Sequence, residues 1–157
     1  MNKRMIAAAA TLLALTALPV MAADKAALPK GYEKWEKSSE KVVNDKNSLF
    51  YGIHYTYVDK KAWPAFKAGG SYPEGSRFVV VFYNIKDEAG KQVRGKKNMI
   101  VLMEKNRKHA ETGGWLFAGF KPDGKPSLVD PVKNCFGCHL KEAKDRDFVI
   151  SRYADFR

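Results

Sequence analysis

Two cysteines and a histidine stand close together near the end of the chain, in the segment Cys135-Phe136-Gly137-Cys138-His139. This C-x-x-C-H spacing is typical of a site where haem is attached covalently. Thiols at this spacing can add across the two vinyl groups of the porphyrin, and the adjacent histidine then lies under the iron, where Nε2 can bind it. We expect the other ring nitrogen to donate its proton to a backbone carbonyl or to water. The predicted cofactor is therefore one haem c, held by Cys135 and Cys138, with His139 as the metal ligand.

Other uses of a cysteine pair have less support in the sequence. A thioredoxin-like dithiol needs a βαβ surrounding, and half of a zinc site needs a second Cys/His pair. The other histidines, His54 and His109, lie far apart along the chain. A plain disulfide is the third alternative.

The first 23 residues have the three parts of a secretory signal. Lys3 and Arg4 form a basic start, residues 5–20 are apolar and uncharged, and small residues surround Ala22-Ala23, the expected cleavage point. The apolar run is short for a membrane span, so an uncleaved anchor is the weaker alternative. We expect export to the periplasm, no membrane attachment after cleavage, and a single haem-binding domain over residues 24–157. Free thiols would be exposed to oxidation there, which also favours a cofactor on the cysteines.

The chain of 157 residues carries 28 Lys and Arg against 17 Asp and Glu, and loss of Lys3 and Arg4 lowers its net charge from +11 to +9. The basic residues are spread over the region 91–97 and the surroundings of the cysteine motif, where acids interleave. This pattern, in an exported chain without a nucleic-acid-binding motif, argues against nucleic acid as a partner. The charges could pair with haem propionates or steer an acidic redox partner, or they could form a solvated surface with no partner.

Alternating apolar residues predict four or five strands. Phe50, His54 and Thr56 share one face of the first strand, and Phe78, Val80 and Phe82 share one face of the second. The predicted strands are Ser48–Asp59, Arg77–Ile85, Asn98–Glu104, Trp115–Phe120 and Asp147–Tyr153.

Helical signals are fewer. An amphipathic helix is predicted over Leu28–Asn47, a short helix over Lys60–Ala68 that ends at Gly69, and a further helix begins at Asp130-Pro131 before the cysteine motif. Residues 88–95 are expected to form a long polar loop between two paired strands. The predicted fold class is α+β and mainly β: an antiparallel β-sheet with a few flanking helices, whereas most small c-type cytochromes are nearly all helical.

Several motifs extend along the chain in a recognisable order: Leu28-Pro29-Lys30-Gly31-Tyr32 with Trp35, Tyr57-Val58-Asp59, Thr112-Gly113-Gly114-Trp115, and the late C-x-x-C-H followed by Asp147-Phe148-Val149. Their order and spacing resemble the cytochrome P-460 / cytochrome c′-beta family over nearly the whole mature chain. The resemblance implies a mainly antiparallel β subunit, usually a homodimer, with one c-type haem. It also implies five-coordinate iron, with the motif histidine on one side and an open distal face on the other.

The two branches of that family differ at one lysine. The P-460 branch oxidises hydroxylamine and carries a lysine cross-linked to the porphyrin, whereas the c′-beta branch lacks the link. Aligning Tyr57-Val58-Asp59 and Gly75-Ser76 with the family pattern puts Val80 at the lysine position, and Lys67 and Lys86 are the nearest lysines. The sequence is therefore similar to the c′-beta branch. The same alignment puts His54 where the P-460 branch has a polar basic residue, which leaves one hydrogen-bonding group near the haem.

The resemblance also implies an apolar distal pocket lined by aromatic residues, for which Phe50, Phe78 and Phe82 are the candidates. An apolar site disfavours water and anions, because it cannot replace their lost hydration, and so favours nitric oxide and carbon monoxide. The alternative for each phenylalanine is the ordinary core, which is also the expected place of Trp35, Trp63 and Trp115. His54 could likewise be an ordinary core or surface histidine, and His109 is expected at the surface.

The function predicted from these observations is a periplasmic mono-haem cytochrome that binds nitric oxide or carbon monoxide for scavenging, sensing or storage, with electron transfer to the haem. This favours a binding protein over an enzyme. A hydroxylamine-oxidising enzyme of the P-460 type is one alternative. The other is an electron-transfer cytochrome with Met99 or Met103 as a sixth ligand.

Overall fold

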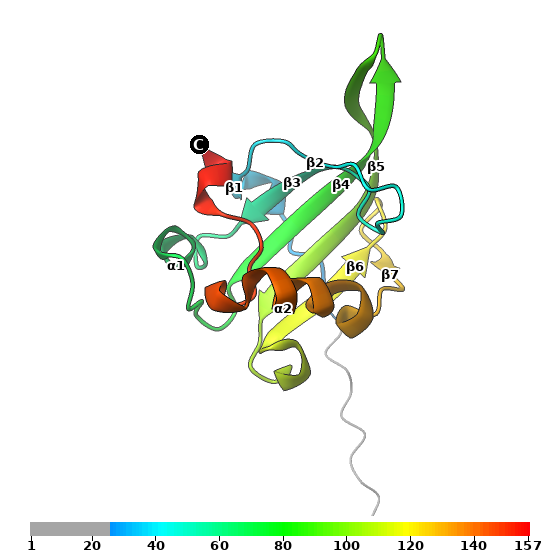
Figure 1. Cartoon of the computed structure of the whole chain (residues 1–157). Coiled ribbons are helices and arrows are strands. Elements are labelled where there is room, and N and C mark those ends of the chain that lie inside the picture. The colour runs from blue at the N-terminus through cyan, green and yellow to red at the C-terminus, as the bar shows by residue number, and fades with distance from the viewer. Residues whose placement is uncertain (1–25) are drawn as a thin grey trace, which may run out of the picture.

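The computed structural model describes residues 26–157, and the predicted signal segment, residues 1–23, lies outside them. Its centre is a seven-stranded sheet in which all pairs are antiparallel, with the order β1-β3-β4-β5-β6-β7 and β2 also paired with β3 (Figure 1). The strands are β1 (Glu36–Lys37), β2 (Lys41–Val43), β3 (Gly52–Val58), β4 (Arg77–Glu88), β5 (Lys91–Lys105), β6 (Trp115–Phe120) and β7 (Pro126–Ser127).

The helices are short, and the longest helical stretch contains the cysteine motif. It consists of three consecutive segments: the π-helix η3 (Pro131–Phe136), α2 (Gly137–Ala143) and the 3-10 turn η4 (Lys144–Arg146). The others are η1 (Tyr32–Lys34), α1 (Trp63–Ala68), η2 (Ala110–Thr112) and η5 (Tyr153–Phe156). Among residues 26–157, no helix is long and apolar enough to cross a membrane.

Each face of the sheet has its own apolar core, because successive side chains of a strand point to opposite faces. Phe78 and Met103 belong to the core on the face covered by α1, α2 and the C-terminal segment (Figure 1). Val79 and Leu102, their neighbours along β4 and β5, belong to the core on the opposite face, which Tyr32 of η1 helps to cover. The sheet is thus buried on both sides of its central strands, and the cysteine motif lies over one side only.

The mainly β, antiparallel architecture with flanking helices is as predicted, and so are the strands near 52–58, 77–88 and 115–120, the helix that ends at Gly69, and the helix start at Asp130.

The helix predicted over Leu28–Asn47 was wrong. This segment forms η1 and the short strands β1 and β2, whose backbones pair with the edge of β3. The apolar spacing of this segment favours a helix, but pairing with β3 overrides that weak local preference.

The strand predicted over Asp147–Tyr153 was also wrong, because Asp147 and Phe148 have φ angles of 49° and 64°, which a strand cannot accommodate.

The long loop predicted over residues 88–95 is instead a tight turn at Ala89-Gly90, and β5 begins at Lys91. This stretch is polar because the β4–β5 hairpin extends beyond the body of the protein, where both of its faces meet solvent (Figure 1).

Candidate functional site

A mainly apolar cavity lies between the sheet and the helical stretch that carries the cysteine motif. The space between its walls, including its open mouth, is about 880 Å³. The sheet contributes Val43, His54, Thr56, Phe78, Val80, Phe82, Val101, Met103 and Phe117, and the remaining walls are formed by Phe50, Cys135, Cys138, His139, Val149, Ile150 and Ser151. All eight residues singled out as cofactor contacts from the sequence line this one cavity.

Local sequence explains how the motif is placed at the cavity. Asp130 caps η3 by accepting hydrogen bonds from the backbone N–H groups of Val132 and Lys133, each at 3.0 Å, and Pro131 occupies the first turn. Cys135 follows near the end of η3, and Cys138 and His139 lie on α2. The cap therefore fixes the start of the helical stretch from which all three side chains reach the cavity.

The environment of Cys135 argues against thiol redox chemistry. Its side chain is buried, and burial, with smaller contributions from Asp130 and Cys138, raises the pKa of the thiol to about 11. Reactive redox cysteines have a lowered pKa, since the thiolate is the nucleophile. Cys138 is exposed. Within the part of the chain that the structure describes, no three His, Cys, Asp or Glu side chains gather into a metal cluster, which gives the zinc alternative no support.

His139 is held with one ring nitrogen free. Its Nδ1 lies 2.6 Å from the backbone carbonyl oxygen of Phe148, and since a carbonyl only accepts, Nδ1 carries the proton. This is the backbone partner expected from the sequence. Burial lowers the pKa of His139, an effect that the hydrogen bond to Phe148 partly opposes, so the ring is neutral near pH 7 and Nε2 keeps its lone pair. A neutral imidazole with a free Nε2 at a cavity wall is suited to bind a metal.

The sheet side of the cavity, together with Phe50 from the segment just before β3, is aromatic and aliphatic. The ring centroids of Phe50 and Phe82 are 5.3 Å apart. Val80 lies at the centre of the sheet, where it pairs with Thr56 and Val101. Phe78 contributes to the cavity but is 2% exposed and packs mainly against core rings such as Trp115. No lysine is among the described residues that line the cavity.

Among the described residues of this sheet wall, His54 is the one with a titratable side chain. Its ring is 5.0 Å from that of Phe82, and its Nδ1 is buried without a hydrogen-bond partner. Burial and, to a smaller extent, the charge of Lys41 lower the pKa of His54, while Asp155 acts in the opposite direction. The imidazole is therefore neutral near pH 7 and is available to hydrogen-bond with a group in the cavity.

The structure places the methionines, tryptophans and His109 in different surroundings. Met103 lines the cavity and Met99 does not, although both lie on β5. Trp115 is fully buried in the core, as predicted, and neither Trp35 nor Trp63 reaches the cavity. His109, expected at the surface, is half-buried, with Nδ1 3.2 Å from a carboxylate oxygen of Glu111.

Sequence reasoning missed several wall residues. Phe117 alternates on a correctly predicted strand, so that alternation could have indicated its place. Thr56 was placed on the correct strand face without being proposed as a wall residue. No local signal marked the segment 149–151, because its position depends on the turn at Asp147-Phe148.

These residues fit a haem. A thiol pair and a free imidazole nitrogen meet at one wall, and apolar side chains suited to a porphyrin face them. Fold and site together define the class: a mainly β haem protein. The sequence model of the Cytochrome P460 family matches residues 29–151, and the chain belongs to this family. A comparison with curated proteins found no match.

Proposed function

We propose that this chain is an exported cytochrome with one haem c, bound covalently through Cys135 and Cys138, and that the open face of the haem binds nitric oxide or carbon monoxide. The single observation that carries the proposal is the composition of the cavity. One wall offers two thiols and the free Nε2 of His139, and the facing wall is almost entirely apolar. When bound, haem supplies an iron whose sixth position can take a small diatomic molecule.

The protein's own residues would divide the work between the two walls. Cys135 and Cys138 would anchor the porphyrin, and His139 would supply one axial ligand, oriented by its hydrogen bond to Phe148. Phe50, Val80 and Phe82 would exclude water and anions from the other face. Val80 at the predicted cross-link position and the lack of lysine among the described wall residues support the c′-beta branch over the P-460 branch.

The ferrous optical spectrum tests this proposal most directly. We expect a high-spin, five-coordinate spectrum that shifts when carbon monoxide is added. A low-spin spectrum with sharp α and β bands would instead assign a sixth protein ligand. Met103 is then the first candidate, because it lines the cavity, and Met103→Leu should restore the high-spin form. Haem that is removed by acid-acetone extraction would contradict covalent attachment.

Hydroxylamine oxidation is a second candidate function, and the position of His54 is the observation that favours it. An imidazole with an unpaired, buried nitrogen in a mainly apolar cavity could accept a proton from a substrate. Turnover with an artificial electron acceptor and a red-shifted Soret band would support this function. Absence of both would eliminate it.

Export, assembly and partner are parts of the same proposal. The residues 1–23 support a periplasmic location, and mass spectrometry of the mature protein should find its N-terminus near Asp24. Family resemblance favours a homodimer, which analytical ultracentrifugation would detect. The basic residues around the motif favour an acidic redox partner protein.

A further inference from the structure

Two consecutive residues beside the haem site have unusual backbone conformations. Asp147 and Phe148 lie in the left-handed region, with φ angles of 49° and 64°. Asp tolerates this conformation, but for a bulky side chain such as Phe it is rare and costs free energy. The same turn directs the Phe148 carbonyl oxygen toward Nδ1 of His139. The strained segment is thus the one that orients the proposed axial ligand.

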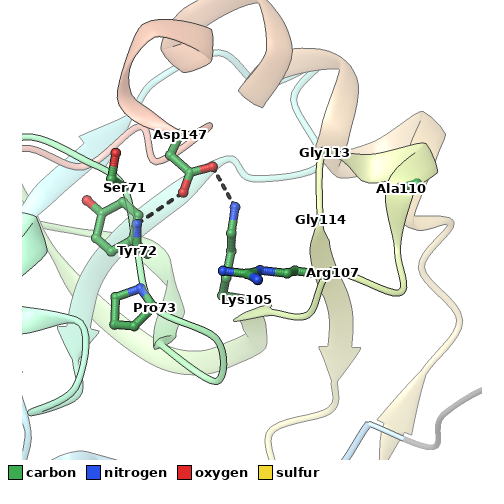
Figure 2. Close-up of a pocket in the computed structure, with 9 residues that line it drawn as sticks. All are labelled: Ser71, Tyr72, Pro73, Lys105, Arg107, Ala110, Gly113, Gly114 and Asp147. Carbon is green, nitrogen blue, oxygen red and sulfur yellow. Dashed lines mark hydrogen bonds and ion pairs between the residues drawn. The ribbon is translucent and has the colours of Figure 1, made fainter.

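The carboxylate of Asp147 holds this turn to the rest of the protein. Its Oδ1 accepts from Nζ of Lys105 at 2.6 Å and from Nε1 of Trp115 at 3.4 Å, and its Oδ2 accepts from the backbone N–H of Tyr72 at 3.2 Å. Figure 2 shows Asp147 between Tyr72 and Lys105, with an interaction to each. The side chains of Lys105 and Asp147 are only 12% and 19% exposed, so solvent screens this ion pair weakly.

The Phe148 side of the turn is fixed by packing. Its backbone N–H donates to the carbonyl of Ala143 at 2.7 Å, and its ring lies against that of Phe136, with 5.3 Å between centroids. A Cβ atom at Gly113 would lie 2.4 Å from the Phe148 ring, so a glycine is needed there. Phe148 therefore has little freedom to move its carbonyl once Asp147 is held.

We propose that Asp147 is a positioning residue for His139, acting through the carbonyl of Phe148. A hydrogen bond from Nδ1–H to that carbonyl raises the basicity of Nε2, and a more basic axial ligand stabilises ferric relative to ferrous iron. Asp147, with Lys105 as its counter-ion, would thereby set the strength of the iron–histidine bond and the reduction potential. The inference rests on the proposed role of His139 as axial ligand.

The test uses the haem-loaded protein with Asp147→Asn. We expect the iron–histidine stretching frequency of the ferrous form, measured by resonance Raman spectroscopy, to fall and the midpoint potential to rise. Asp145→Asn is the matched control. It removes the same charge two residues away from a side chain that is 75% exposed, so it should leave the stretching frequency unchanged and show how much of the potential shift is long-range electrostatics.

A second variant covers the case in which Asp147→Asn does not fold because it leaves Lys105 buried without a counter-charge. Lys105→Met keeps the apolar stem and leaves Asp147 with the Tyr72 and Trp115 donors. We therefore expect the iron–histidine stretching frequency to fall by less than in Asp147→Asn. A stretching frequency equal to that of wild type in the folded variants would overturn the proposal. A wild-type protein with no iron–histidine band would contradict the axial role of His139 instead, so the two failures are distinguishable.

Discussion

At the scale of single residues, the function depends on which atoms are left free at the cavity wall. Nδ1–H of His139 donates a hydrogen bond to the Phe148 carbonyl oxygen, so the free lone pair of the ring is the one at Nε2. His54 has the opposite character, because its buried Nδ1 has no partner. One imidazole is therefore oriented by the protein, and the other can respond to whatever occupies the cavity.

Phe50 provides the sharpest test of the apolar wall. Its side chain is half-buried and packs against Phe82, so Phe50→Ala should admit water to the cavity at a modest cost in stability. We expect the ferric spectrum to gain a six-coordinate, water-bound component and carbon monoxide association to become faster.

Phe78→Ala is the comparison, because Phe78 is 2% exposed and belongs to the core. It should lower the free energy of unfolding by about 3–5 kcal/mol, as large-to-small changes of buried aromatic residues do. Unchanged spectra and gas kinetics in both variants would remove these two residues from the distal wall.

His54 should make stability depend on pH. Burial lowers its pKa in the folded protein below the ordinary value of 6.5, so the unfolded chain binds a proton at His54 more readily. The free energy of unfolding should therefore fall as the pH decreases below about 6.5. Lys41 and Asp155, which form an ion pair at 2.7 Å beside His54, remain in place in a His54→Gln variant.

We expect denaturant titrations of the haem-loaded protein to show a weaker loss of stability in His54→Gln than in wild type between pH 6.5 and pH 5. Parallel pH profiles for the two proteins would contradict a lowered pKa at His54.

At the scale of elements, the cap of η3 controls how the cysteine motif is presented. Asp130→Ala removes the acceptor for two backbone N–H groups and should lower the free energy of unfolding by about 1 kcal/mol. Asp130→Asn is the control, because an asparagine side chain also caps helices and should recover most of the loss. Thermal unfolding of the three proteins measures the effect, and equal losses for Ala and Asn would show that the cap is unimportant.

At the scale of the whole molecule, the relevant quantity is the net positive charge of the chain, to which the basic residues near the cysteine motif contribute. Lys133, Lys141, Lys144 and Arg146 surround the motif, and the predicted mature chain carries +9 before the haem propionates are counted. Such a field attracts anions and repels cations over a Debye length of about 10 Å at 0.1 M salt. The rates at which the haem reacts with charged reagents should therefore depend on this field.

We expect oxidation of the ferrous protein by ferricyanide to slow as ionic strength rises, and oxidation by hexaammineruthenium(III) to accelerate. Lys141→Glu should reduce the ferricyanide rate. Lys91→Glu makes the same charge change at the far end of the β4–β5 hairpin, which projects from the opposite part of the molecule, and should have a smaller effect (Figure 1). Equal effects of the two variants would mean that the charges around the motif provide no local steering.

The sequence by itself determined the features that depend on local chemistry. The C-x-x-C-H spacing gave the thiol pair and histidine, the Asp130-Pro131 signal gave the helix start, and alternation on β4 correctly put Phe78, Val80 and Phe82 on one face. Each of these features lies within a few residues of the signal that predicts it. Period-two alternation also sufficed for the mainly β fold, because the central strands are long enough to show it.

Only the tertiary structure decided what depends on partners distant in the sequence. Residues 28–47 have a helical period, yet β1 and β2 pair with β3, since hydrogen bonds to a strand edge outweigh weak local propensity. Asp147 and Phe148 adopt a conformation that no local pattern predicts, because Lys105, Tyr72 and Trp115 hold Asp147 from other elements. That turn supplies the Phe148 carbonyl that orients His139, so the orientation of the candidate ligand depends on long-range packing. Its place beside the two cysteines, in contrast, follows from five consecutive residues.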